Sequence, residues 1–310
     1  MTIFQHGTPY FSLSRWLKEI FGEPVRKISL DAGLSCPNRD GTLGIEGCLY
    51  CNARGSGTGA FSRGISIEQQ INDAIDFLSN RYKCRKFIAY FQSFTNTYAP
   101  VEKLRRFYLE ALQRPEIVGI AIGTRPDCVS DAVLDMIQEV AKGRLVWMEY
   151  GLQSAHERTL RLIKRGHDPT AFFDACSRTQ KRGFKVVVHL ILGLPGETIG
   201  DMLFTARSVA RAGVDGVKLH PLYVVRGTGL ARLMTHGQYT PLTESEAQEA
   251  TLAVLRALPP HIVIHRLTSD PHPQELLAPT WMLDRAGVRS RLEQRMVTTH
   301  FVQGSDCNDI

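Results

Sequence analysis

The sequence predicts an α/β fold, a partial TIM-like (β/α)6 barrel with a C-terminal α/β extension. Six short apolar segments alternate with segments of helical periodicity, which is typical of parallel strands joined by right-handed crossovers. A polar motif follows each expected strand, and such barrels carry functional residues at the carboxyl ends of their strands. We assign residues 1–226 to the barrel with its N-terminal segment and residues 227–310 to an extension packed on it.

The first half of the chain alternates three expected strands with three expected helices. A capping box from Ser66 to Gln69 marks the start of the first helix, and Ile71, Ala74 and Leu78 continue its apolar face. The strands are expected at 25–30, 86–91 and 117–122, and the helices at 67–81, 101–113 and 130–140.

The second half repeats this alternation and ends in a tail. The segment 184–192, FKVVVHLIL, is a largely apolar run, typical of a strand buried on both faces. Further strands are expected at 144–151 and 216–219, with helices at 157–164, 169–182 and 199–212. The tail should hold a helix at 243–258, a strand at 262–266, Trp281 and a basic helix with Arg285, Arg289, Arg291 and Arg295.

The composition is that of a globular chain with a sizeable core, at 43% hydrophobic and 22% charged residues. No apolar run reaches the roughly 18 residues that a membrane span needs, so we expect no membrane partner. Seven cysteines without an export signal predict a cytoplasmic location. The net charge of +6 permits an anionic partner such as RNA but does not require one.

Three cysteines lie within 16 residues, in the stretch CPNRDGTLGIEGCLYC. Cys36, Cys48 and Cys51 could form a soft metal centre, and an iron–sulfur cluster with only three protein ligands would keep one iron open to a cofactor. A zinc site completed by His6 or a distant cysteine is the alternative, as are incidental buried thiols. The remaining cysteines are expected to be structural or surface thiols: Cys84, Cys128, Cys176 and Cys307.

Several motifs carry a family resemblance. The C-x-Y-C ending resembles radical S-adenosylmethionine (SAM) enzymes. EYGLQSAHERTLRLIKRGHD and HLILGLPGET resemble the members related to the Elongator catalytic subunit and to the coproporphyrinogen oxidase HemN, over about residues 20–225. CPNRDGT, YFQSFTNTYAP and HRLT resemble the YhcC/YtqA branch, in which a gap of 11 residues between the first two cysteines is normal.

The resemblance implies a [4Fe-4S] cluster ligated by Cys36, Cys48 and Cys51, with Tyr50 shielding it. The open iron would chelate the amino and carboxylate groups of SAM. The reduced cluster would then split SAM into methionine and a 5′-deoxyadenosyl radical that abstracts a substrate hydrogen, with flavodoxin or ferredoxin as a possible electron donor.

The resemblance also implies SAM-binding residues at the strand ends. Gln153 would hydrogen-bond SAM, and Arg165 would bind its carboxylate or else be a solvated helix charge. Glu149 would be a ligand or a core salt-bridge partner, and Gly193 would let backbone approach the adenine or only form a turn. One residue of the second strand end would accept a hydrogen bond from the SAM amino group: Ser93, Thr95 or Asn96.

Three histidines are candidates for moving protons, namely His189, His167 and His220. His189 stands where HemN-like enzymes contact SAM through an aspartate. It could take over that contact, face the substrate as a base, or be a satisfied strand histidine.

The resemblance points to tRNA as substrate, with processing of the C5 side chain of the wobble uridine. The alternatives are radical chemistry on a small metabolite or protein side chain, and a non-catalytic metal-binding protein. The four arginines of the last helix would offer an RNA surface or form an ordinary solvated face.

Overall fold

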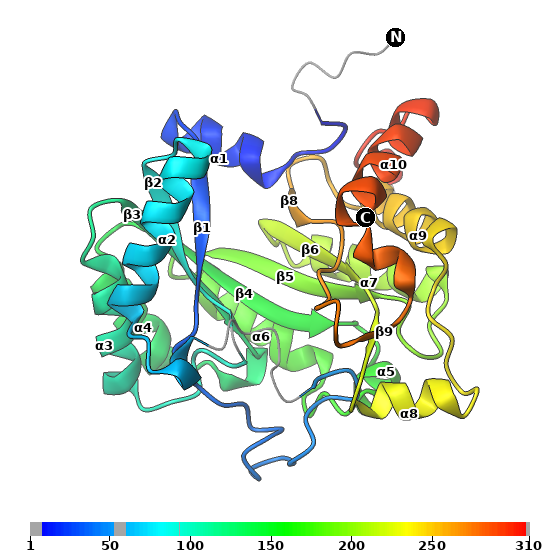
Figure 1. Ribbon diagram of the computed structural model, residues 1–310, viewed down its shortest axis with the longest axis horizontal. Coiled ribbons are helices and arrows are strands. Elements are labelled where there is room, and N and C mark those ends of the chain that lie inside the picture. The colour runs from blue at the N-terminus through cyan, green and yellow to red at the C-terminus, as the bar shows by residue number, and fades with distance from the viewer. Residues whose placement is uncertain (1–7, 53–59, 93, 308–310) are drawn as a thin grey trace.

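The computed structural model describes residues 8–52, 60–92 and 94–307. Seven parallel strands form one sheet in the order β1-β2-β3-β4-β5-β6-β8, curled into a half-barrel (Figure 1). The partial α/β barrel is confirmed, with one strand more than expected. The strands are β1 (Val25–Leu30), β2 (Lys86–Phe91), β3 (Ile117–Thr124), β4 (Leu145–Gln153), β5 (Lys185–Leu192), β6 (Gly216–Pro221) and β8 (Val263–Arg266).

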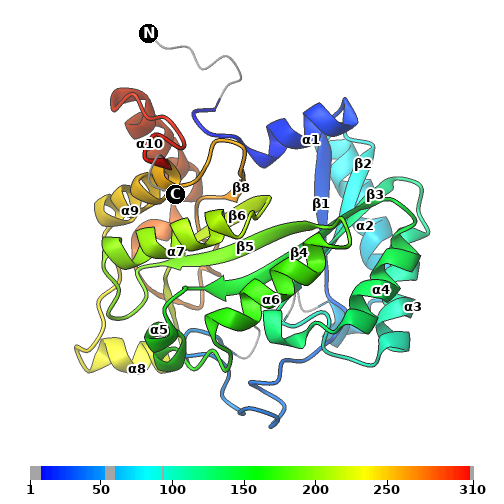
Figure 2. The ribbon, with the colours of Figure 1, turned by 180° about the vertical axis from the view of Figure 1, so that it is seen from behind.

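Helices cover the outer face of the sheet, and Figures 1 and 2 show them wrapped around its two sides. Each expected crossover helix is present with ends shifted by only one or two residues. Ser66, Ser130 and Thr198 cap three of them through side-chain oxygens. The helices are α2 (Ile67–Tyr82), α3 (Val101–Leu112), α4 (Asp131–Ala141), α5 (Glu157–Leu162), α6 (Pro169–Gln180) and α7 (Ile199–Arg211).

Alternate residues of β5 serve different cores. Val186, Val188 and Leu190 belong to the large core between the sheet and the helices. Val187 belongs to a smaller core inside the barrel, which places His189 on the same inner face. The prediction of a strand buried on both faces is confirmed, and His189 faces the barrel interior.

An N-terminal helix that the sequence analysis did not predict closes the amino end of the barrel. Helix α1 (Leu13–Phe21) is capped by Ser12 and contacts both β1 and β8. The ring of Trp16 lies 5.3 Å from that of Trp147 on β4, and Ile264 N–H donates to the Phe11 carbonyl at 2.8 Å. The described N-terminal residues therefore bridge the two edges of the open sheet.

The C-terminal segment both extends the sheet and packs beside it. The strand expected in the tail is β8, which pairs in parallel with β6. The boundary between residues 226 and 227 stays a prediction, because β8 makes the extension continuous with the barrel sheet. The remaining elements are β7 (Val224–Val225), α8 (Gly229–Thr235), α9 (Glu244–Ala257), β9 (Leu276–Ala278) and α10 (Arg285–Thr298).

The four arginines expected on the last helix are all engaged within the chain. Arg285 pairs with Asp270, Arg289 with Glu293, and Arg291 with Glu244 and Asp284. Arg295 donates to the Ser245 carbonyl at 3.2 Å. This arrangement favours the ordinary helix face over the RNA surface. Among the described helices, none is long and apolar enough to cross a membrane.

Candidate active site

The cysteine loop follows β1 and lies against the ends of two helices. Its last turn is closed by the Cys51 N–H, which donates to the Cys48 carbonyl at 2.9 Å. Leu49 N–H donates to the carbonyl of Ile163 just after α5, and Leu230 N–H at the start of α8 donates to the Leu49 carbonyl. Figure 1 shows the loop, in blue, beside α5 and α8. The two later cysteines are thus held at the carboxyl-end rim of the barrel.

Asn38 braces this loop from inside. Its side-chain nitrogen lies 3.3 Å from Cys48 Sγ, 2.9 Å from the Lys164 carbonyl and 3.1 Å from the Arg165 carbonyl. A side chain at Gly166 would place a Cβ 2.7 Å from Asn38 Oδ1, and Gly166 also has a φ of +77°. The loop and the turn after α5 therefore fit each other only with asparagine and glycine at these positions.

Arg125, in the TRPD motif after β3, holds the other side of that turn. Its Nη1 donates to the Arg165 carbonyl at 2.7 Å, and its other nitrogens form a two-pronged ion pair with Asp127 at 3.0 and 2.8 Å. Arg125 is buried, so the pairing with Asp127 supplies the counter-charge it needs.

Arg165 connects β4 to the cysteine loop. Its Nε and Nη2 donate to the Gly151 carbonyl at 3.2 and 2.7 Å, and its Nη1 lies 3.6 Å from Cys48 Sγ. Those contacts use three of five N–H groups, which leaves two for an anion. Arg165 is buried, so it is not a solvated helix charge; its binding of the SAM carboxylate stays a prediction.

Gly151 and Gln153 shape the end of β4. A Cβ at Gly151 would lie 2.6 Å from Arg165 Nη2 and 2.8 Å from Gln153 Nε2, so both side chains pass over this glycine. Gln153 has a φ of +75°, a strained value for a residue with a side chain, next to a register shift against β5. Gln153 and Arg165 are thereby brought together, as the motif spacing predicted.

The thiols of the cysteine motif are not equivalent. A hydrogen bond with Cys51 and the charge of Arg165 hold the pKa of Cys48 well below its usual value, despite burial. The same hydrogen bond and burial raise the pKa of Cys51. Burial and the negative charge of Cys48 raise the pKa of Tyr50, which packs beside them. Cys48 therefore has thiolate character, the form that binds metals.

Cys36 begins the same loop but is not drawn into one ligand set with the other two. In the described segments, no three His, Cys, Asp or Glu side chains form a group that could hold a metal ion. Cys36 is buried, and its carbonyl accepts the Arg39 N–H at 2.8 Å. The three-cysteine ligand set stays a prediction.

At the end of β2, the candidates for the SAM amino group differ in their surroundings. Ser93 lies outside the described residues. Asn96 has structural bonds, since its Nδ2 donates to the Gly123 carbonyl at 2.8 Å and its backbone carbonyl accepts from the Tyr108 hydroxyl, but neither bond uses Oδ1, the atom that would accept from SAM. The buried Thr95 Oγ1 has no hydrogen-bond partner in the part of the chain that the structure describes. An orphaned buried hydroxyl favours Thr95 as the acceptor.

Inside the barrel, Glu149 is the centre of an ionic network. Its carboxylate accepts from Lys27 of β1 and Lys218 of β6, and from His189 Nε2 of β5 at 3.0 Å. Lys218 also donates to the Tyr90 hydroxyl at 2.9 Å. These contacts match the core salt-bridge alternative for Glu149. They also make His189 a satisfied strand histidine, although both residues face the interior where a substrate would lie.

Burial sets the protonation states in this network. It lowers the pKa of Lys218 to about 7 against the opposing pull of Glu149, and lowers the pKa of His189 to about 4. Glu149 has its pKa held well below its usual value by Lys218 and Lys27, which outweigh burial. The carboxylate is therefore ionised and His189 is neutral near pH 7.

The other two candidate histidines lie in different places. The ring of His220 stacks on that of His189 at 5.2 Å, and its buried Nε2 has no partner among the described residues. His167 lies outside this pair: its Nδ1 is 3.0 Å from the Asp168 carbonyl, and burial and the charge of Arg165 lower its pKa to about 4. Of the three candidate histidines, His189 and His220 lie together in the barrel interior.

Gly193 has a structural reason to be glycine. Its φ is +82°, a Cβ would lie 2.8 Å from Leu242, and its carbonyl accepts from the Tyr239 hydroxyl at 2.9 Å. These contacts match the turn that was the alternative to an adenine contact.

The sequence analysis missed several residues of the site. Asn38 lies inside the quoted motif CPNRDGT, and Arg125 follows the third expected strand, where functional residues were expected, so both positions carried a signal. Lys218 also had a signal, because a lysine within an expected buried strand requires a partner. No sequence signal pointed to Lys27, Tyr90 or His265, because their contacts depend on strands far apart in the sequence.

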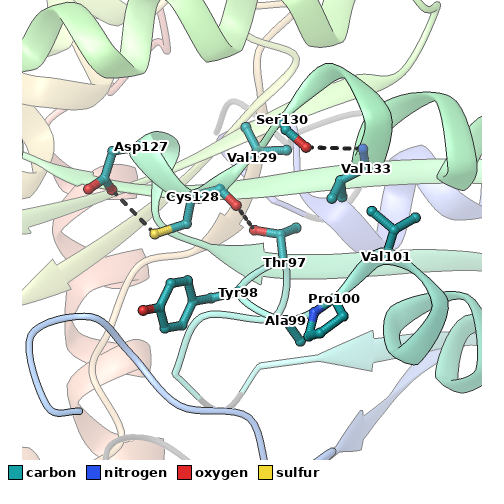
Figure 3. Close-up of a pocket in the computed structure, with 10 residues that line it drawn as sticks. All are labelled: Thr97, Tyr98, Ala99, Pro100, Val101, Asp127, Cys128, Val129, Ser130 and Val133. Carbon is teal, nitrogen blue, oxygen red and sulfur yellow. Dashed lines mark hydrogen bonds between the residues drawn. The ribbon is translucent and has the colours of Figure 1, made fainter. Parts of the chain in front are cut away.

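Two hollows lie near the strand ends, and one of them is lined by residues of the cysteine loop. One, of about 230 Å³, is lined by Cys48, Cys51, Lys164 and Arg232. A larger one, of about 640 Å³, lies between the segments after β2 and β3 (Figure 3). There Thr97 donates to the Cys128 carbonyl at 2.6 Å, so its polar rim is already partly bonded. The smaller hollow is the one that meets the cysteines.

The residues at the rim fit an iron–sulfur cofactor with a bound anion. Cys48 has thiolate character with N–H donors aimed at its sulfur, Thr95 offers an orphaned acceptor, and Gly151 leaves room that a side chain would fill. Donors of this kind stabilise ligating sulfurs and tune a cluster. A half-barrel with such a rim belongs to the class of cofactor-dependent α/β-barrel enzymes.

More specifically, the chain belongs to the radical SAM superfamily. The superfamily model matches residues 36–209, and a radical SAM C-terminal domain matches residues 214–298. The chain is 42% identical over 289 residues to protein YhcC of Escherichia coli K12, covering 92% of this chain and 91% of YhcC. It is 37% identical over 295 residues to the uncharacterized protein YtqA of Bacillus subtilis, covering 95% and 92%.

The fold is similar to that of the Elp3 protein of the archaeon Methanocaldococcus infernus, with a TM-score of 0.71 at 19% identity. The match covers 90% of this chain and 64% of that chain. At this identity the likeness shows the fold alone. Together the matches confirm the predicted family and its YhcC/YtqA and Elongator-related branches. Members of this superfamily use SAM, a [4Fe-4S] cluster and a reductant.

Proposed function

We propose that this radical SAM enzyme modifies tRNA by processing the C5 side chain of the wobble uridine, with a [4Fe-4S] cluster ligated by Cys36, Cys48 and Cys51. The observation that carries the cluster site is the environment of Cys48. Asn38 and Arg165 both direct N–H groups at its sulfur, and Arg125 fixes the turn that carries Arg165. A thiolate with such donors is prepared to bind iron.

Each residue at the rim has a defined task in this proposal. Arg165 and Gln153 orient SAM from the end of β4, and Thr95 accepts from its amino group. Tyr50 covers the cysteines and keeps water from them. When bound, the cluster supplies the electron that splits SAM into methionine and a 5′-deoxyadenosyl radical, which removes a substrate hydrogen. His189 and His220 line the interior, where a neutral imidazole can accept or return a proton.

Two observations support RNA as the substrate class. The motifs shared with the YhcC/YtqA branch and with the Elongator-related enzymes carry the resemblance to tRNA-modifying enzymes. The net charge of +6 suits a polyanion. The arginines of α10 are not part of this support, because each is engaged within the chain. The electron donor we propose is an acidic reductant such as flavodoxin or ferredoxin.

The first test is anaerobic reconstitution with iron and sulfide, reduction with dithionite, and chromatographic detection of 5′-deoxyadenosine from added SAM. Cys51→Ala should abolish its formation. Cys307→Ala is the matched control, since Cys307 lies outside the cysteine loop and its thiol bonds the Arg256 carbonyl within the described residues. Zinc binding without any SAM cleavage would disprove the cluster assignment and leave a metal-binding barrel.

The second test concerns the substrate. Undermodified tRNA should stimulate SAM cleavage and lose its wobble side chain, as nucleoside analysis by mass spectrometry would show. Binding should weaken steeply with salt, because phosphate contacts release counterions. Cleavage that no tRNA stimulates, together with salt-independent behaviour, would favour a small metabolite or a protein side chain.

A further inference from the structure

The pairing of β8 with β6 contains a bulge that turns two consecutive side chains toward the barrel. Val217 pairs with Ile264, but the next pair joins Lys218 to Arg266, so His265 is an extra residue on β8. Bulges commonly redirect side chains beside functional sites. His265 enters the interior, with its Nδ1 3.4 Å from Lys27 Nζ and its ring 4.8 Å from that of Trp147. Arg266 then stands above it, beside Lys218.

Arg266 is exposed, and no ion pair or side-chain hydrogen bond engages it within the described residues. Its charge nevertheless affects the pKa values of groups inside the barrel. Burial holds the pKa of His220 well below its usual value, and the positive charge of Arg266 acts in the same direction. Burial and Cys51 raise the pKa of Tyr223, and Arg266 opposes them. Arg266 also pairs with Lys218, whose side chain points into the barrel, so the exposed side chain of Arg266 starts from the same face of the sheet at the barrel mouth.

The network at the mouth holds three basic side chains, and Arg266 is the one that keeps its full charge, because burial lowers the pKa of Lys218 to about 7 and also lowers the pKa of Lys27. Lys27, Lys218 and Arg266 are basic, whereas Glu149 is the single carboxylate among the described residues that bond within this network. Both lysines are already bonded to Glu149, so Arg266 is the cation left over. The sulfonium of SAM would add a further positive charge. An anionic group on the substrate would pair with Arg266 beside a low-dielectric interior, where attraction between opposite charges is stronger than in water.

We propose that Arg266 anchors an anionic oxygen group of the substrate, a carboxylate or a phosphate, at the mouth of the barrel. The proposal rests on the radical SAM function given above and adds the class of group that the substrate must carry. A guanidinium binds either group through two parallel N–H bonds, a geometry that lysine cannot reproduce. The anion would sit between Arg266 and the Lys218 side of the network, which places the rest of the substrate over His189 and His220.

Arginine modification tests this assignment without requiring any turnover. The reconstituted protein is treated with phenylglyoxal, and labelling of Arg266 is followed by peptide mass mapping in the presence of acetate, inorganic phosphate, acetamide or SAM. Arg211 is the internal control, because it is exposed at the end of α7 and has no side-chain partner in the described chain. We expect acetate or phosphate in the millimolar range to slow labelling of Arg266 at least fivefold relative to Arg211.

Each outcome decides the assignment. Protection by acetate alone identifies a carboxylate, and protection by phosphate alone identifies a phosphate. Protection by SAM alone would assign Arg266 to the cofactor and overturn the proposal, as would equal labelling of Arg266 and Arg211 under all conditions. Acetamide should not protect, because it carries no charge.

A kinetic arm separates this proposal from the proposed function. With undermodified tRNA, Arg266→Gln should raise KM tenfold or more. The KM of Arg266→Lys should lie between those of the wild type and Arg266→Gln. The control Arg211→Gln should have the wild-type KM. If tRNA stimulates no turnover of the wild type, the proposed function fails while the labelling result still decides the role of Arg266. A KM for Arg266→Gln equal to that of the wild type would overturn the anchor.

Discussion

Glu149 and Lys218 form a buried ion pair across β4 and β6 at the centre of the barrel. The Glu149 side chain has no exposed surface, and that of Lys218 is 7% exposed. The same carboxylate also serves Lys27 and His189. One acid therefore serves two lysines and a histidine, and its removal should matter more than removal of either lysine.

We expect Glu149→Gln to lower the free energy of unfolding by about 3–5 kcal/mol, because it leaves two buried lysines without their carboxylate partner. Lys218→Met should cost less, roughly 1.5–3 kcal/mol, since Lys27 and His189 continue to bond the carboxylate. Urea denaturation of both variants measures the difference. Glu139→Gln, an exposed pair with Arg105, is the control and should change stability by less than about 1 kcal/mol. Equal losses for Glu149→Gln and Lys218→Met would contradict the sharing of one carboxylate.

The depressed pKa of His189 makes stability depend on pH. Burial lowers this pKa from 6.5 to about 4, and Lys218 and Arg266 face the ring as further positive charges. Between those pH values His189 is protonated in the unfolded chain but stays neutral in the folded chain, so the stability of the folded state falls as the pH falls. The slope is about 1.4 kcal/mol per pH unit for one proton.

His189→Gln should therefore lower the slope of unfolding free energy against pH, between pH 6.5 and pH 4, by the contribution of about one proton. The glutamine amide can still donate to Glu149. Urea midpoints measured across this range in both proteins provide the test. An unchanged slope would mean that His189 is not the group that resists protonation.

The fold and the cysteine motif were predictable because their signals are local. The apolar run of β5 and the capping box of α2 each depend on a few consecutive residues. The ionic network was not predictable, because Lys27, Glu149 and Lys218 meet only once three strands are curled and staggered. The seventh strand was placed in the tail rather than in the sheet, because β8 follows β6 after a long intervening segment.

Asn38 should control how firmly the cluster is held. Asn38→Ala removes the N–H donor to Cys48 Sγ and the two bonds to the turn at Lys164 and Arg165. We expect iron and sulfide per chain after reconstitution to fall several-fold, since partners of metal ligands typically contribute 10–100-fold in affinity. Asn80→Ala, on the exposed face of α2, is the matched control. Full iron loading of Asn38→Ala would show that the Asn38 amide stabilises the loop but does not contribute to holding the cluster.

Gly151 should be required for SAM binding. The Cβ of Gly151→Ala would displace Arg165 Nη2 and Gln153 Nε2, which lie 2.6 and 2.8 Å from its position. We expect SAM affinity to fall tenfold or more in equilibrium binding measurements. Gly200→Ala is the control, because its Cβ would meet only Thr198 Oγ1 at an ordinary 3.5 Å. In the α7 helix that change should stabilise the protein by roughly 0.5–1 kcal/mol. Unchanged SAM affinity in Gly151→Ala would remove Arg165 and Gln153 from the SAM site.

The arginines of α10 should be dispensable for RNA binding. Arg291 bonds Glu244 and Asp284 at 2.6 and 2.8 Å, so an RNA phosphate would have to displace two carboxylates to reach it. Because these partners are solvent-exposed, Arg291→Gln should cost less than about 1 kcal/mol of stability. The affinity for tRNA and its salt dependence should match the wild type in filter-binding titrations. If instead the salt slope falls by about one unit, Arg291 contacts a phosphate and its ion pairs exchange for RNA.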